Sequence, residues 1–145
     1  MNSKKLRVLL VDDDPFLTEL LKRHFEEEGV KEIIIARNSQ ECLEAFKKCD
    51  VIILDYHLDD GNGIDVLREI KSQDPNLPVI FLSGQEYVNI AIRSLKFGAF
   101  DYLEKSKLNF NKLMEVINKA IEQGKLFRRE ERLRKIRSFP SMGLF

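Results

Sequence analysis

The sequence predicts an α/β protein in which helices cover both faces of a doubly wound, five-stranded parallel sheet. Short runs rich in β-branched residues alternate with helical patterns along the chain. These runs, such as 51–54, are apolar without alternation, which is typical of strands buried on both faces. Polar residues directly follow the strands, and ligands bind beyond the carboxyl ends of strands in such sheets. Those strand ends are therefore the first places to look for function.

Five pairs of strand and helix, a (βα)5 chain, are predicted in order. Gly29 ends the first helix, and Asn38 with Glu41 forms a capping pair for the second. Pro75 and Pro78 precede the fourth strand. The predicted strands are 6–11, 33–36, 51–54, 79–82 and 102–103, and the predicted helices are 15–28, 39–48, 64–72, 87–97 and a last one from about 111.

Composition favours one compact domain without a strong overall charge. The chain has 145 residues, of which 43% are hydrophobic, so it can bury a core. Lys plus Arg equal Asp plus Glu at 24 each, which gives no global field to attract nucleic acid or an acidic membrane. Cys42 and Cys49 match no metal-binding spacing. With few cysteines, no signal peptide and no membrane-length apolar stretch, we expect a cytoplasmic location.

Three consecutive aspartates, Asp12, Asp13 and Asp14, stand between the first strand and Pro15. Adjacent negative charges repel one another in a partly desolvated site unless a cation compensates them. Mg²⁺ is the natural partner, because it binds one or two carboxylates together with waters and phosphate oxygens. The alternative is that the aspartates cap the helix that begins at Pro15 and complement its dipole. A cap explains one aspartate well and three poorly.

The residues after the other strands complete a set that is suited to phosphoryl transfer. Asp55 follows the third strand, Ser83 the fourth and Lys105 the fifth, and we expect them to meet Asp12 and Asp13 at one edge of the sheet. Asp55 would be the nucleophile, and Mg²⁺ (or Mn²⁺) bound by Asp12, Asp13 and Asp55 would neutralise charge. Lys105 and the Ser83 hydroxyl would hold phosphoryl oxygens.

Four segments within about 5–123 resemble the receiver domains of bacterial two-component response regulators, which have a flavodoxin-like fold. They are VLLVDDD at 8–14, VIILD at 51–55 with Gly63 eight residues after Asp55, PVIFLSG at 78–84 and GAFDYLEK at 98–105. The resemblance implies a phosphorelay protein whose own chemistry is limited to self-phosphorylation and self-dephosphorylation, and so no enzyme. The implied roles are phosphoacceptor for Asp55, acidic pair for Asp12 and Asp13, switch hydroxyl for Ser83, phosphoryl contact for Lys105, aromatic switch for Tyr102, and a metal contact for the backbone carbonyl of His57.

The same resemblance implies how the signal enters and leaves. The donor would be a phosphohistidine on a sensor histidine kinase or a histidine phosphotransfer protein, docked near 16–20. Phosphorylation would draw Ser83 toward the phosphoryl group and let Tyr102 swing inward. This two-state packing switch would reshape the surface formed by the fourth helix, the fifth strand and the fifth helix.

Two positions depart from the family pattern. Asp59 stands where the family usually has proline, four residues after the acceptor, and Ser106 stands where proline usually follows the lysine. We expect altered loop geometry but retained chemistry, because every charged group of the site is present. His57 and Gln85 occupy the positions that tune the lifetime of the phosphoryl group in receivers.

Three other functions compete with that of a phosphorylated receiver. A receiver-like module that binds partners without phosphorylation is the first, although all five site residues are present. An Mg²⁺-dependent aspartyl phosphatase generally has a second aspartate two residues after the nucleophile, where this chain has His57. A dinucleotide-binding domain would need a glycine-rich loop where acidic residues stand.

The chain divides into a receiver domain at 1–123 and, at 124–145, a basic helical extension with a flexible end. Lys125 to Arg137 is strongly basic, with Leu126, Leu133 and Ile136 at a/d-like spacing and Gly124 as a weak point. Such a charged helix resembles receivers of the nitrogen-regulation (enhancer-binding) class, which suggests a homodimer through the C-terminal helix. No membrane contact is expected, nor direct nucleic-acid binding, because no DNA- or RNA-binding motif accompanies the basic run. A stand-alone receiver and a piece of a longer regulator both stay open.

Overall fold

The computed structural model describes residues 5–84 and 87–143, with side chains over 5–84 and 87–137. Its main sheet has five parallel strands in the order β2-β1-β3-β6-β7, which confirms the predicted doubly wound sheet. The strands lie within about two residues of the predicted ranges. They are β1 (Arg7–Val11), β2 (Glu32–Ala36), β3 (Val51–Leu54), β6 (Val79–Ser83) and β7 (Asp101–Glu104).

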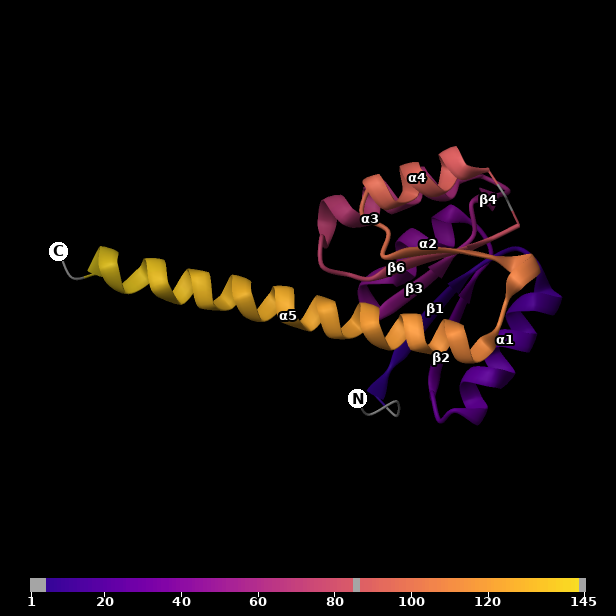
Figure 1. The fold of residues 1–145 in the computed structure, drawn as a ribbon, viewed down its shortest axis with the longest axis horizontal. Helices are drawn as coiled ribbons and strands as arrows, with labels where there is room; N and C mark the ends of the chain where they lie inside the picture. The colour runs from indigo at the N-terminus through magenta and orange to yellow at the C-terminus, as the bar shows by residue number, and fades with distance from the viewer. Residues whose placement is uncertain (1–4, 85–86, 144–145) are drawn as a thin grey trace.

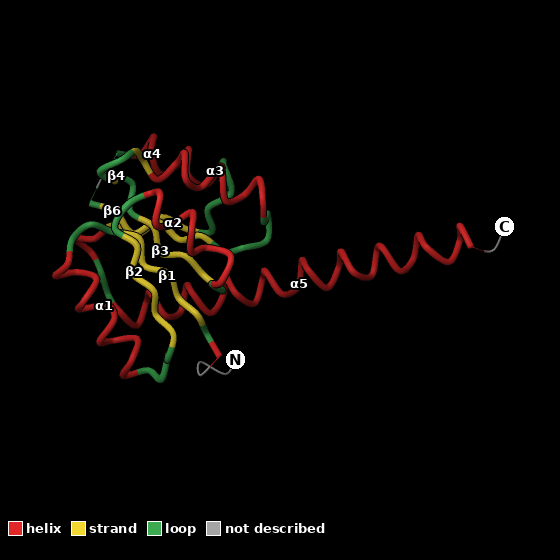
Figure 2. Tube along the Cα trace, turned by 180° about the vertical axis from the view of Figure 1, so that it is seen from behind, coloured by secondary structure: helices red, strands yellow, loops and turns green. Residues whose placement is uncertain are grey.

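Five α-helices cover the two faces of this sheet (Figures 1 and 2). Helices α1 and α5 pack on one face, where Phe25 and Ile117 are fully buried. Helices α2, α3 and α4 pack on the other, where Phe46 and Leu67 are buried. The bounds are α1 (Pro15–Glu27), α2 (Ser39–Ala45) continued by a 3-10 turn (Phe46–Lys48), α3 (Gly63–Gln73), α4 (Val88–Lys96) and α5 (Phe110–Gly143).

The strand order reverses between β1 and β3, and this switch point brings their carboxyl ends side by side. Val11 is paired with Leu54, and the backbone N–H of Asp55 donates to the carbonyl of Val11 at 3.0 Å. The residues that follow these two strands, Asp12 and Asp55, are therefore neighbours in space. Strand β7 delivers Lys105 to the same edge of the sheet.

Local capping explains several element ends. The Asp14 carboxylate accepts hydrogen bonds from the backbone N–H groups of Phe16 and Leu17, at 3.0 and 3.3 Å. Asp14 is thus the cap of α1, which leaves Asp12 and Asp13 for the site. Asn38 accepts from the N–H of Glu41 at 2.8 Å, as predicted. Gly29 has a φ of 88°, the left-handed conformation with which helices commonly end.

The predicted C-terminal helical extension is confirmed. Helix α5 runs without interruption from Phe110 to Gly143, so Gly124, the expected weak point, does not break it. Two causes account for this. Gly124 is buried against the domain, and 125–137 consists mainly of Lys, Arg, Glu and Leu, which are good helix formers. None of the described helices is both long enough and apolar enough to cross a bilayer.

Candidate functional site

Lys105 is the centre of a charged cluster at the carboxyl edge of the sheet. Its Nζ lies 2.6 Å from Oδ2 of Asp12 and 3.1 Å from Oδ2 of Asp55. Both aspartates are buried, with 7% and 6% of their surface exposed. Asp12 also accepts a hydrogen bond from the backbone N–H of Asp14 at 2.9 Å. Residues from three different strand ends therefore meet at one point, as the sequence predicted.

Burial and pairing act against each other in this cluster. Burial raises the pKa of Asp12, while hydrogen bonds from Lys105 and the Asp14 backbone oppose the rise. For Lys105, burial alone would lower the pKa, but its hydrogen bond with Asp12 and the negative charges of Asp55 and Asp12 outweigh burial and raise it. Lys105 thus remains a firmly charged ammonium that neutralises two buried carboxylates.

Asp13 completes a group of carboxylates that suits a hard divalent cation. One carboxylate oxygen each from Asp12, Asp13 and Asp55 lies within 4.8 Å of the others. Asp13 is exposed and opens this group to solvent, while Asp12 and Asp55 form its buried side. The all-oxygen donor set and the open side fit Mg²⁺, which usually keeps several waters.

Ser83 and Tyr102 lie on the side of the site that faces the hydrophobic core. Ser83 ends β6 and is completely buried, and it forms a hydrogen bond with Tyr102 that acts to lower the tyrosine pKa. Burial has the larger effect and raises the pKa of Tyr102. The Tyr102 ring stacks on Phe81, with centroids 5.9 Å apart. The tyrosine therefore lies against the core at the end of the strand that carries Ser83.

A short loop after Asp55 was not predicted to be structured. It contains a small antiparallel hairpin, β4 (His57–Leu58) with β5 (Gly61–Asn62), closed just before α3. Gly63 follows the hairpin, and a Cβ there would lie 2.5 Å from the carbonyl oxygen of Asp55. The glycine is therefore needed for the loop to return close to Asp55. Asp59 and Asp60 form the turn of this hairpin, and Gly61 follows them as the partner of Leu58, so a run of turn-favouring residues was the available signal.

The departures from the family pattern lie in or near this loop. Asp59 is exposed, and its pKa is raised mainly by the charge of Asp13 and a hydrogen bond between the two carboxylates. Ser106 lies in a 3-10 turn over Lys105–Lys107. His57 is exposed, with its ring 5.1 Å from that of Tyr56. Gln85 lies outside the described residues.

The chain matches a known protein family in both sequence and structure. Residues 8–118 match the family of the response regulator receiver domain. The chain belongs to this family. The match includes every predicted site residue and all of the main sheet except its first residue, Arg7.

The receiver is similar to parts of longer regulators and to isolated domains. It is 38% identical to the transcriptional regulatory protein TrcR of Mycobacterium tuberculosis, over 69% of this chain and 39% of that protein. It is 36% identical to a protein-glutamate methylesterase/protein-glutamine glutaminase of Pyrococcus abyssi, over 94% of this chain and 40% of that protein. The receiver thus matches about two fifths of the length of these two relatives.

Solved structures agree with this assignment. A response regulator receiver domain protein from Clostridium thermocellum superposes with a TM-score of 0.77 and 35% identity, covering 84% of this chain and 98% of that one. NtrX from Brucella abortus superposes with a TM-score of 0.78 and 32% identity, covering 89% of this chain and 29% of that one. This chain therefore shares the flavodoxin-like receiver fold with the protein from Clostridium thermocellum and with one region of the larger NtrX.

Proposed function

We propose that this receiver accepts a phosphoryl group on Asp55 from a phosphohistidine of a sensor histidine kinase or a histidine phosphotransfer protein. The observation that carries the proposal is the position of Lys105, 3.1 Å from the Asp55 carboxylate and 2.6 Å from Asp12. An ionised carboxylate beside a fixed ammonium can attack phosphorus, and the ammonium can bind the oxygens of the incoming group.

The step exchanges one bond to phosphorus for another. An Oδ atom of Asp55 forms a bond to phosphorus while the bond from phosphorus to the donor imidazole nitrogen breaks, and the imidazole keeps the electron pair. No catalytic base is needed, because the carboxylate is the nucleophile. Asp12, Asp13, Asp55 and the backbone carbonyl of His57 would hold Mg²⁺ (or Mn²⁺), which supplies positive charge for the transferred oxygens.

The output in this proposal passes through Ser83 and Tyr102. The Ser83 hydroxyl would turn toward the phosphoryl group and exchange its hydrogen bond with Tyr102 for one to a phosphoryl oxygen. Tyr102 lines a groove of about 400 Å³ between α4, β7 and the start of α5. Exposed apolar side chains surround that groove on α4, among them Val88 and Ile92, at 71% and 59% exposure. A changed Tyr102 position would therefore alter a surface that can bind a partner or an output domain.

Within this proposal the receiver has no catalytic activity beyond its own phosphorylation and dephosphorylation, and it works in the cytoplasm. The domain would span 1–123, with 124–145 as its helical extension. Tyr56 and His57 follow Asp55, so the second aspartate of an aspartyl phosphatase does not stand two residues after the nucleophile.

The test is intact-mass spectrometry after incubation with acetyl phosphate and Mg²⁺. We expect a single phosphoryl adduct that disappears in Asp55→Asn and on chelation of the metal. Asp65→Asn is the matched control, because Asp65 is an exposed aspartate at the start of α3, and it should keep the adduct. A folded protein that gains no adduct would instead indicate a module that binds partners without phosphorylation.

A further inference from the structure

Helix α5 leaves the domain at Gly124. Before this point its inward side is buried, with Ile117, Ala120 and Ile121 in the core. Gly124 lies so close to the 76–78 loop that a Cβ would be 3.1 Å from the carbonyl oxygen of Asn76. Beyond it, the helix projects well past the sheet (Figure 1). Contact with the domain continues to Arg128, whose guanidinium lies 3.6 Å from the Asp74 carboxylate, while Leu126, Leu133 and Ile136 stay exposed.

The projecting part carries an apolar stripe of Leu126, Leu133 and Ile136. Their exposed fractions are 50%, 44% and 62%. Spacings of seven and three residues place all three on one side of a helix, as in the a and d positions of a coiled coil. Exposed large apolar side chains in one row are a usual mark of a binding surface for another helix.

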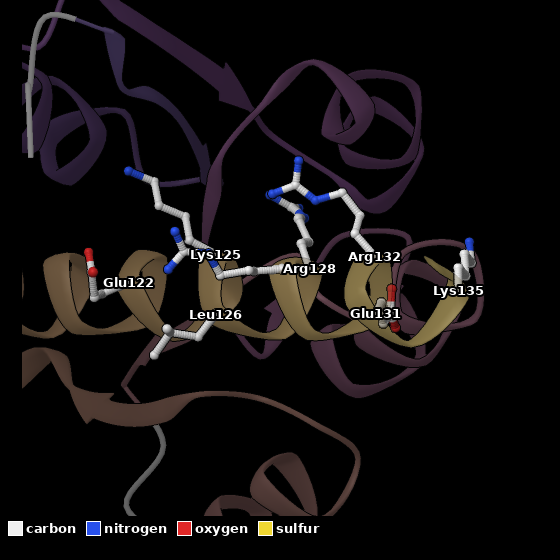
Figure 3. A pocket seen from close by; sticks show the side chains of 8 residues that line it. Glu122, Lys125, Leu126, Arg128, Glu131, Arg132 and Lys135 are labelled. Carbon is white, nitrogen blue, oxygen red and sulfur yellow. The ribbon is translucent and has the colours of Figure 1, made fainter. Parts of the chain in front are cut away.

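The stripe is bordered by positive charge. Residues 125–137 contain seven basic side chains and two acidic ones, whereas the whole chain is neutral. Lys125 and Arg132 each precede a leucine of the stripe, and Arg129 lies between the two leucines. Figure 3 shows Lys125, Arg128 and Arg132 projecting to one side of α5, with Leu126 pointing elsewhere. Together with Lys135 they line an open groove of about 690 Å³.

We propose that this part of α5 binds an acidic amphipathic helix of a partner protein. Leucines of such a helix would cover the stripe, and its glutamates or aspartates would pair with Lys125 and Arg132, which flank the stripe as partner-selecting charges do in coiled coils. Arg129 lies within the stripe at a d-like position and would pair with an acidic side chain placed opposite it. The proposal does not depend on phosphorylation of Asp55.

Two other occupants fit the surface less well. A second copy aligned along the stripe would bring two strongly basic segments together well within the Debye length of about 8 Å. A nucleic acid would satisfy the cations through its phosphates but leave the three apolar side chains in water. An acidic helix satisfies both the charge and the apolar stripe.

The test uses the full chain and a synthetic acidic zipper peptide of about four heptads, with Leu at a and d and Glu at e and g. Fluorescence anisotropy of the labelled peptide measures binding. A peptide with Lys in place of every Glu and a short DNA duplex serve as comparison probes. We expect the acidic peptide to bind at least about tenfold more tightly than the basic one, with the difference shrinking as salt rises.

Variants separate this surface from general charge attraction. Lys125→Glu with Arg132→Glu should weaken binding of the acidic peptide by at least about tenfold. Lys31→Glu with Lys47→Glu changes the net charge equally at exposed positions elsewhere, and it should change affinity by no more than about threefold. Leu133→Asp and Leu126→Ser should each weaken binding, while circular dichroism checks that both remain helical.

Several results would overturn the proposal. One is equal binding of the acidic and basic peptides. Another is DNA binding that outcompetes the acidic peptide and survives the leucine substitutions. A third is a dimer in sedimentation experiments on the chain alone that Leu133→Asp abolishes, which would assign the stripe to a second copy.

Discussion

The carboxylate of Asp60 accepts a hydrogen bond from the backbone N–H of Ser39 at 2.7 Å, although 21 residues separate them in the sequence. The same carboxylate accepts from the N–H of Gln40 at 3.1 Å. A residue of the loop that follows Asp55 therefore caps α2, and these backbone hydrogen bonds lower the pKa of Asp60. The loop is thus tied to a helix directly beside Asp59, the position where the family usually has proline.

These hydrogen bonds predict that Asp60→Ala loosens the loop that follows Asp55. Asn38→Ala is the matched control, because Asn38 caps the same helix without reaching the loop. We expect both variants to lower the melting temperature, but only Asp60→Ala to weaken Mg²⁺ binding measured by calorimetry, by about tenfold as for other supports of metal sites. Equal Mg²⁺ affinity in the two variants would reduce Asp60 to a simple helix cap.

The hydrogen bonds that the Asp60 carboxylate accepts from Ser39 and Gln40 also have a defined pH dependence. The pKa of Asp60 lies below its ordinary value of 3.8, so its contribution to stability is complete above that pH and is lost as pH falls through the lowered value. Amide exchange of Ser39 and Gln40 should therefore stay slow down to pH 4. Asp60→Ala should show fast exchange at these amides over the whole range.

Lys105→Ala should destabilise the metal-free protein by about 3 kcal/mol, the lower end for removing one partner of a buried ion pair, because Asp12 and Asp55 would lose the cation that compensates their burial. Mg²⁺ should then raise the melting temperature of the variant more than that of the parent, since the metal would provide the missing charge. Lys107→Ala is the control: that side chain is 79% exposed and paired with Glu104 at 3.3 Å. Denaturant unfolding with and without Mg²⁺ measures both effects, and equal stabilisation by Mg²⁺ in both variants would contradict the prediction.

Gly63→Ala should cost about 3 kcal/mol of unfolding free energy, at the upper end for overpacking, because the added methyl group meets backbone as well as side-chain atoms. It would lie 2.5 Å from the Asp55 carbonyl oxygen and 2.7 Å from the Phe81 ring. Gly84→Ala is the control, because nothing lies within 4 Å of a Cβ at that position. Chemical denaturation of the two variants gives the comparison, and a similar small cost for both would show that the loop can yield.

The two cysteines should be unreactive in the folded protein. Burial is the main cause that raises the pKa of both thiols from the ordinary value of 9.0. The pKa of Cys42 rises to about 12 and that of Cys49 to about 11. Stability from these neutral thiols is complete below pH 9 and is lost as pH rises through the raised values. Labelling by a disulfide reagent at pH 8 should therefore proceed only as fast as the protein opens, and mild denaturant should accelerate it. Labelling at the rate of a free thiol would show that the core opens readily.

Much of the fold was predictable because its signals are local. Apolar runs identified all five strands of the main sheet, and residues at their ends identified the charged cluster, since parallel strands share one carboxyl edge. The sequence predicted Asp12 and Asp13 as the acidic pair but did not show which aspartate caps the first helix. Only the backbone geometry after Val11 assigns Asp14 to the helix and leaves Asp12 beside Lys105.

What the sequence did not predict depends on contacts between distant segments. The Asp60 tie joins residues 21 positions apart, and no local pattern marks it. The two-residue hairpin strands are too short for a periodic signal. The helical extension was predicted with Gly124 as its weak point. What local sequence does not show is the packing of Gly124 against Asn76 and Pro78, which compensates for the low helix propensity of glycine.

The length of α5 gives the domain a lever. Its 34 residues span about 51 Å at about 1.5 Å each, and the part beyond Gly124 accounts for roughly 29 Å of this. A tilt of about 10° at Gly124 would displace the far end by about 5 Å, so a small change of angle beside the 76–78 loop becomes a larger movement at the tip. The root of the helix therefore amplifies small changes in the domain into displacements that a bound partner can detect.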